Sequence, residues 1–215
     1  MQFSKVSASV LRLSSRRTST LTAAQQALIP NRFNNSQDTG IKLTHVSAAM
    51  CTAGRHEQQF GVVEVRHQPH TNGAAFPAVW EAPGYDANYA AANENDIYEY
   101  LGPVTVNGGI VTITHHWNTY ANTQEKIKVN TGIKASTSMN VVSSVHVPSA
   151  LPYYFNGKRI GPVIDLAGTN MDQHTQKIPI NLAIGASFIG APSAGAIDGT
   201  HIYDIDRATA LQFSA

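Results

Sequence analysis

The sequence has little cysteine, little charge and no long apolar run, and each shortage excludes a class of protein. Cys51 is the single cysteine of the 215 residues, so neither an intrachain disulfide nor a cysteine-based zinc site can form. We expect its thiol to be buried as a small apolar group. No apolar stretch approaches the ~18 residues of a membrane span, and the N-terminus lacks the apolar core of a secretory signal.

The few charges that the chain carries are distributed unevenly. Charged residues make up 13% of the sequence, and the charged residues before Asp38 are all basic, whereas the rest of the chain is mildly acidic. The basic residues of this first segment are Lys5, Arg12, Arg16, Arg17 and Arg32. The sequence therefore predicts a basic arm over residues 1–37 and a body over residues 38–215.

The arm shows weak helical patterns. Val6, Val10 and Leu13 have the spacing of a short amphipathic helix. Thr22 can cap a second short helix over residues 23–28, which would end before Pro30. We expect an arm that is extended or partly helical.

From Ile41 onward the chain consists of short runs rich in Val, Ile, Thr and Tyr, most of them separated by Gly, Pro or Asn. Residues 107–109 are the strongest hairpin signal, and residues 126–131 alternate as a strand with one wet face. Helices are expected only within residues 86–100 and 206–214. The pattern predicts an all-β body, an antiparallel jelly roll or β-sandwich of about 8–10 strands.

Candidate chemical sites are few in this sequence. The motifs of serine hydrolases, P-loop proteins, dinucleotide-binding proteins and zinc proteases are missing, so we expect no enzyme and no cofactor. The histidines of 67–70 and 115–116 lack ligand spacing, so we expect no metal site there. The acidic stretches 93–96 and 198–206 are expected to be solvated loops, with a calcium ion bridging two subunits as the alternative. Trp80, Trp117 and the tyrosines Tyr153 and Tyr154 could form a sugar platform, although aromatic packing in the core or an interface is more common.

Three features together resemble the coat proteins of small icosahedral viruses. They are the basic leader "VLRLSSRRTST", the hinge "IPNRFNNSQDTG" and the series of strands from Ile41. In that family the arm lies inside the shell near the genome, and a jelly-roll body tiles the shell. The resemblance implies a self-assembling capsid protein of an icosahedral virion, without membrane contact, whose arm faces the genome or straps neighbouring subunits together. Its partners would be copies of itself, other coat proteins and viral nucleic acid, bound non-specifically through the five basic residues Lys5, Arg12, Arg16, Arg17 and Arg32.

Two other functions stay open. The body could be a carbohydrate-binding or adhesive β-sandwich module, in which case Trp80 or Trp117 would be exposed. The Arg-rich and Ser-rich leader also has the composition of a presequence that is cleaved from an organellar protein. The coat-protein hypothesis depends on a leader that is separate from the body. A leader that is part of the core, with its guanidinium groups paired to the chain's own carboxylates, would contradict it.

Overall fold

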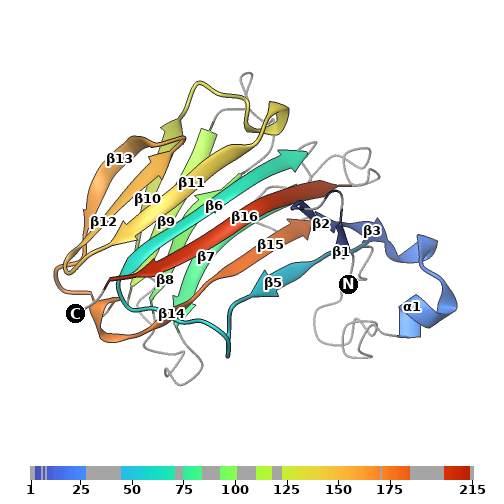
Figure 1. Ribbon diagram of the computed structural model, residues 1–215, viewed down its shortest axis with the longest axis horizontal. Helices are drawn as coiled ribbons and strands as arrows, with labels where there is room; N and C mark the ends of the chain where they lie inside the picture. Colours follow the sequence, from blue (N-terminus) through green and yellow to red (C-terminus); the bar gives the residue numbers. More distant parts are fainter. Residues whose placement is uncertain are drawn as a thin grey trace.

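Two antiparallel sheets make up most of the protein (Figure 1). The computed structural model describes residues 3–5, 7, 9–27, 45–70, 75–83, 93–100, 110–117, 123–169, 171–184 and 201–213. Every strand pair among them is antiparallel.

The first sheet, which we call the β6 sheet, has seven strands. Their order is β1 (Phe3–Lys5), β2 (Leu11–Ser14), β16 (Ile202–Gln212), β6 (Gly61–His70), β11 (Asn140–His146), β12 (Ala150–Phe155) and β13 (Lys158–Asp165).

The second sheet, which we call the β8 sheet, also has seven strands. Its order is β10 (Thr123–Asn130), β9 (Ile110–Trp117), β8 (Glu94–Glu99), β7 (Ala75–Pro83), β15 (Pro179–Ile184) and β5 (Ala49–Cys51), with β14 (Gln176–Lys177) paired to β7 beside this path. A small ribbon and four short helical segments complete the described elements: β3 (Arg16–Arg17), β4 (His45–Val46), α1 (Ala23–Ala27), η1 (Thr18–Thr20), η5 (Ala135–Thr137) and η6 (Met171–Gln173).

Local sequence explains why these strands form and where they turn. In β6, Val63, Val65 and His67 are buried, while the residues between them are partly exposed, as expected for a strand with one face on the core. The β12–β13 hairpin turns at Asn156 and Gly157, whose φ angles are 51° and 76°. A tight turn of this kind needs positive φ at both central residues, which Asn-Gly supplies at low cost.

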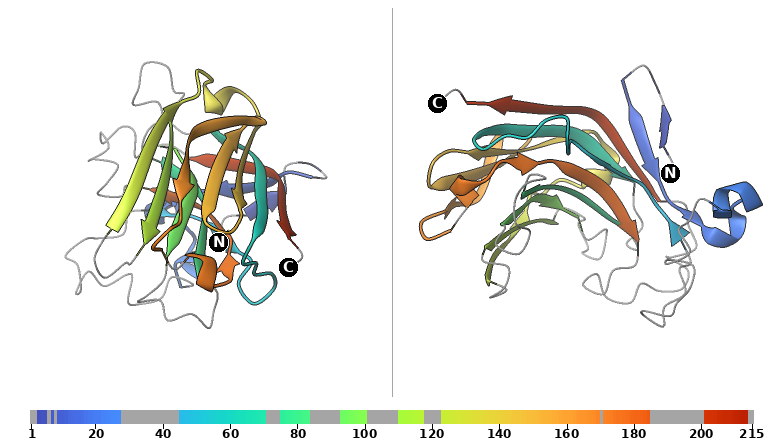
Figure 2. Two further views of the ribbon diagram at one scale, coloured as in Figure 1. Left: turned by 90° about the vertical axis from the view of Figure 1, so that its left-hand side faces the viewer. Right: turned by 90° about the horizontal axis from the view of Figure 1, so that it is seen from below.

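The core lies between the two sheets. Val65, Val142 and Leu151 of the β6 sheet face Val79 and Ile113 of the β8 sheet, and all five side chains are almost completely buried. The right-hand view of Figure 2 shows the sheets as stacked, curved layers. The predicted all-β jelly-roll or sandwich fold is therefore confirmed. None of the described helices is long and apolar enough to span a membrane.

The predicted arm contributes strands to the sandwich. The expected helix around Val10 and Leu13 is wrong: β2 pairs with β16, and Leu13 is completely buried in the core. The second helix is confirmed as α1. Thr22 and Gln25 cap it reciprocally, because the Gln25 amide donates to Thr22 Oγ1 at 3.3 Å and the Thr22 amide donates to Gln25 Oε1 at 3.1 Å.

Several other local predictions are also decided. The expected C-terminal helix is wrong, because the segment continues β16 and pairs along β6. Cys51 is exposed on β5, not buried. Strand β10 has the expected wet face, with Lys126 and Lys128 exposed and Ile127 half-buried against Gly161 of β13. The hairpin tip at 107–109 and the predicted boundary at 37–38 lie outside the described residues.

Candidate active site

A cleft lies on the face of the β8 sheet that is turned away from the β6 sheet. Its volume is about 490 Å³. Five strands contribute its lining, which consists of Phe76, Ala78 and Trp80 on β7, Glu94, Asp96 and Glu99 on β8, Thr114 on β9, Lys126 on β10, and Asn181 and Ala183 on β15.

Strand alternation places the first two acids of β8 in this cleft. Glu94 and Asp96 are two residues apart, so their side chains leave the strand on the same face. Asn95 between them points to the interior, where its side-chain carbonyl accepts a hydrogen bond from the hydroxyl of Tyr153 on β12. The cleft acids therefore lie on the face of the sheet that is turned away from the core.

A β-bulge places the third acid beside them. Glu99 follows Asp96 by three residues and would point to the opposite face in a regular strand. The register against β9 shifts here: Asp96 lies opposite Thr114 and Glu99 opposite Thr112, so β8 contains one residue more than its partner. The extra residue turns Glu99 back to the cleft side, while Ile97 and Tyr98 both lie in the core.

Hydrogen bonds fix the side chains that line the cleft. Thr114, itself 1% exposed, donates its hydroxyl to Glu99 Oε2 at 2.6 Å. The indole nitrogen of Trp80 donates to Asn181 Oδ1 at 2.7 Å, so the ring is held between β7 and β15. The result is a cleft with three carboxylates, one ammonium group and a fixed aromatic side chain. Pairs of carboxylates in a cleft are the groups that cleave glycosidic bonds.

Solved structures of glycoside hydrolases have this fold. The laminarinase catalytic domain from Thermotoga maritima superposes with a TM-score of 0.76 over 98% of this chain and 80% of that chain, at 18% identity. A glycoside hydrolase family 16 endo-glucanase from Bacteroides ovatus gives 0.75 over 97% and 84%, at 19% identity. SCLam, a non-specific endo-β-1,3(4)-glucanase of the same family, gives 0.71 over 95% and 72%, at 18% identity.

The chain has their jelly-roll fold. No protein-family model matches the sequence, and no curated protein sequence matches it. The resemblance to viral coat proteins is wrong, because the similar structures are a laminarinase catalytic domain and two endo-glucanases. The expectations that depended on it are corrected with it: a virion location, a capsid made of copies and other coat proteins, and a nucleic-acid partner. The expectation of no enzyme, which rested on missing motifs, is contradicted by the same structures, because they are enzymes. The general jelly-roll layout is shared by both classes, which explains the error.

The basic residues expected to bind nucleic acid are placed differently from one another. Arg12 lies on β2 and forms two hydrogen bonds of 2.7 Å to the carboxylate of Asp204 on β16, which raises the pKa of the guanidinium. Arg16 and Arg17 are exposed on β3. Lys5 lies on β1, but its side chain is outside the described part. Arg32 lies outside the described residues. Arg12 is thus paired with a carboxylate of the body. The coat-protein hypothesis required a separate leader, so this pair contradicts it.

The structure places some of the histidine and aromatic side chains that the sequence singled out. Burial against Tyr98 and Tyr203 lowers the pKa of His67 to about 3, so this histidine is a neutral core residue. Trp80 lies in the cleft, as the sugar-platform hypothesis requires. The side chains of Trp117, His70 and His116 lie outside the described part. Within that part, no group of three His, Cys, Asp or Glu side chains could hold a metal ion.

The sequence patterns did not identify the acids of the cleft. Residues 93–96 were expected to be a solvated loop, but Glu94–Glu99 form a central strand of the β8 sheet. A signal was present, because Glu94, Asp96 and Glu99 flank the apolar pair Ile97 and Tyr98. The spacing of five between the two glutamates does not fit simple alternation, so only the bulge reveals that they share a face.

Proposed function

We propose that this protein hydrolyses glycosidic bonds of a β-linked glucan, with Glu94 and Glu99 as the catalytic carboxylates. The observation that carries the proposal is the presence of both glutamates, with Asp96 between them, on the cleft face of one central strand. The similarity in fold to laminarinases and endo-β-1,3(4)-glucanases supports β-1,3 and mixed β-1,3/1,4 linkages as the substrate class.

The chemistry needs one proton donor and one base or nucleophile. One carboxylic acid protonates the oxygen of the scissile bond, and the sugar leaves as an alcohol. The other carboxylate either attacks the anomeric carbon or takes a proton from the water that attacks it, and the net reaction adds one water across the bond. Asp96 lies between the two glutamates along the strand, where its charge stabilises the positive charge that develops on the sugar ring.

The rest of the cleft suits a polysaccharide chain. Trp80 presents an aromatic ring whose orientation Asn181 fixes, and sugar rings stack on such surfaces through their C–H faces. A volume of about 490 Å³ is within the range of roughly 300–1,000 Å³ typical of ligand sites.

The test is the release of reducing ends from laminarin and from barley β-glucan by the purified protein. Glu94→Gln and Glu99→Gln should each remove activity, whereas Glu64→Gln should not, because Glu64 lies on the β6 sheet, where it pairs with Arg207 at 2.8 Å. Addition of azide to Glu94→Ala and Glu99→Ala identifies the roles, because a small anion can replace either carboxylate. The anomer of the first product shows whether the second carboxylate attacks the sugar or activates water.

A glucan-binding module without hydrolysis is the second candidate, and the position of Trp80 in the cleft favours it. Binding of laminarin that Trp80→Ala abolishes, without any release of reducing ends, would support this module and contradict the enzyme. Hydrolysis that both glutamate variants remove would exclude it.

A further inference from the structure

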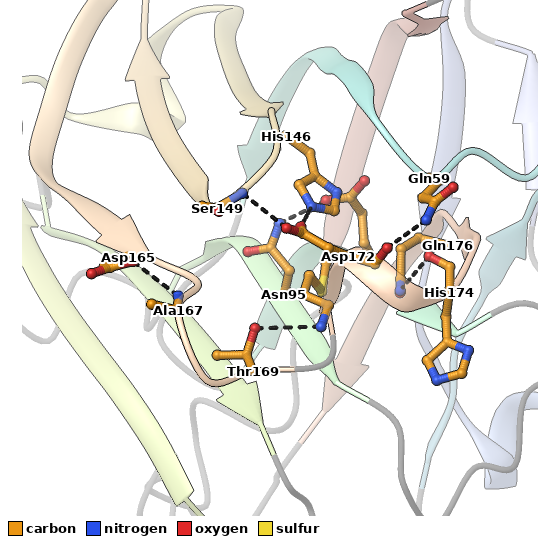
Figure 3. A network of polar contacts seen from close by, with 12 residues as sticks. Gln59, Asn95, His146, Ser149, Asp165, Ala167, Thr169, Asp172, His174 and Gln176 are labelled. Carbon is orange, nitrogen blue, oxygen red and sulfur yellow. Dashed lines mark hydrogen bonds and ion pairs between the residues drawn. The ribbon is translucent and has the colours of Figure 1, made fainter. Parts of the chain in front are cut away.

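A buried carboxyl group lies directly behind the proposed catalytic strand. Glu81 of β7 is 1% exposed and faces the β6 sheet. Its Oε2 accepts a hydrogen bond of 2.6 Å from the side-chain amide of Asn95 and a longer one of 3.5 Å from the hydroxyl of Ser144 on β11. The hydroxyl of Tyr153 donates to the other end of the Asn95 amide at 2.5 Å. Figure 3 draws Asn95 within the surrounding network of polar contacts.

The donors in this cluster are arranged in one direction. Tyr153 donates to Asn95, and Asn95 donates to Glu81, so the chain of hydrogen bonds ends on a group that can carry negative charge. Charge on the acceptor shortens and strengthens such a bond. Glu81 and Asn95 are also opposite each other in the β7–β8 ladder, so the side-chain bond reinforces the backbone register.

Among the described residues, no basic side chain forms a hydrogen bond or an ion pair with Glu81, and the ionisable groups nearest in register are histidine and tyrosine side chains. His115 of β9 lies opposite Asn95 in the β8–β9 ladder, and Tyr153 of β12 bonds to Asn95. His146, two residues after Ser144 on β11, pairs with Asp172 at 2.8 Å, and burial lowers its pKa. Lys177 of β14 lies opposite Ala82 and is partly exposed. Burial raises the pKa of Glu81 to about 7, although the bonds from Asn95 and Ser144 oppose this.

We propose that Glu81 is a positioning residue for the catalytic strand: its ionised form holds Asn95, and Asn95 fixes the backbone from which Glu94 and Asp96 enter the cleft. Asn95 is the direct neighbour of both acids, so a shift of its side chain moves the backbone that carries them. Misplacement of reacting groups by about 1 Å can cost on the order of a hundredfold in rate. Glu81 acts from the opposite face of the sheet and touches no substrate.

This arrangement makes the activity depend on the ionisation of Glu81 as well as on the cleft acids. Above pH 7 the carboxylate accepts a charge-assisted bond from Asn95, and below pH 7 the protonated group accepts a weaker one. We therefore expect kcat to rise about threefold to tenfold through an ascending limb centred near pH 7, while KM changes little.

The experiment compares wild type with two variants across this pH range, and it rests on the proposed hydrolysis. Glu81→Gln keeps an acceptor that does not titrate, so its kcat should lose the limb near pH 7. Glu81→Met removes the acceptor at similar volume, and we expect kcat to fall about tenfold to a hundredfold with KM changed less than about twofold. A limb near pH 7 that persists in Glu81→Gln would overturn the proposal, and so would a wild-type kcat in Glu81→Met.

A second readout separates this proposal from the proposed function. In nuclear magnetic resonance spectra, the backbone amides of Glu94 and Asp96 should shift in wild type with a midpoint near pH 7, and this titration should be missing in Glu81→Gln. The measurement needs no substrate, so a protein without any hydrolytic activity can still support the positioning role. Amide shifts that are identical in the two proteins would contradict it even if the enzyme is active. The matched control is Glu64→Gln, at a partly exposed glutamate of the other sheet, and it should leave the titration unchanged.

Discussion

The two faces of the β8 sheet present the same chemical group in opposite settings. Glu99 on the cleft face and Glu81 on the core face each accept a hydrogen bond of 2.6 Å, from Thr114 and Asn95 respectively. Glu99 lines the cleft, whereas Glu81 is buried between the sheets. Hydrogen bonding alone therefore does not assign a role to a carboxyl group; its access to substrate and to water does.

The two settings also differ in how much an ionised carboxylate costs the free energy of folding. A carboxylate that opens to the cleft keeps part of its hydration, so its charge costs the fold little. A carboxylate in the core loses that hydration, and its charge opposes folding unless a cation or several donors compensate. Asp204 shows the compensated case, because it is 4% exposed and bonded twice to Arg12.

The largest expected effect is on the cleft face. Glu99→Gln keeps the hydrogen bond to Thr114 and removes only the ability to ionise or to donate a proton at this position. We expect kcat on laminarin to fall about a thousandfold, while the melting temperature stays close to that of wild type. The measurement is initial rates together with thermal unfolding. A variant that keeps most of its rate would show that Glu99 does not take part in the chemistry.

The second effect is on the core face and concerns stability. In the folded protein the pKa of Glu81 is about 7, against an ordinary value of 4.5. Between these values the folded state holds a proton that the unfolded chain has released, so this contribution to the free energy of unfolding is complete below pH 4.5 and lost as the pH rises through 7. Glu81→Gln does not titrate and avoids the loss.

We therefore expect Glu81→Gln to unfold like wild type near pH 4.5 and to be more stable by about 3 kcal/mol near pH 8. Urea unfolding at both pH values measures the difference. An advantage that is equal at both would mean that Glu81 does not titrate in this range. Glu64→Gln serves as the control, because Glu64 is partly exposed and should give no pH-dependent difference.

The third effect concerns the buried carboxylate of Asp204 when it loses its cationic partner Arg12. Arg12→Gln removes the partner of Asp204, and we expect a loss of about 2 kcal/mol in the free energy of unfolding, since the Arg12 side chain is 30% exposed and water replaces part of the interaction. Arg16→Gln is the matched control on the neighbouring exposed strand and should change stability by less than about 0.5 kcal/mol. Equal losses in the two variants would show that the Arg12–Asp204 pair contributes nothing specific.

The smallest expected effect concerns the one ammonium group among the cleft residues. Lys126 and Lys128 are both exposed on β10, two residues apart, and of these two only Lys126 lines the cleft. Lys126→Ala should raise KM about threefold through the loss of one hydrogen bond to the glucan, and Lys128→Ala should leave KM unchanged. Steady-state kinetics on barley β-glucan distinguishes them, and equal KM values in both variants would place the sugar chain away from β10.

The sequence by itself determined the fold class and some local structure. Alternating side chains and turn residues act over a few positions, which is why the all-β sandwich, the Thr22 cap and the wet face of β10 were predictable. The cleft was not, because Glu94 and Glu99 share a face only through a bulge, and the bulge is set by the register of β8 against both of its neighbours.

The tertiary structure alone decided the partners of the charged groups. Arg12 and Asp204 are 192 positions apart, and only the β2–β16 ladder brings them together. Glu81 meets Asn95 across a second ladder and Ser144 across the core. The charge pattern of the first 37 residues has the same appearance whether an arginine faces a phosphate or a buried aspartate. Long-range strand pairing, which no local pattern encodes, makes the choice.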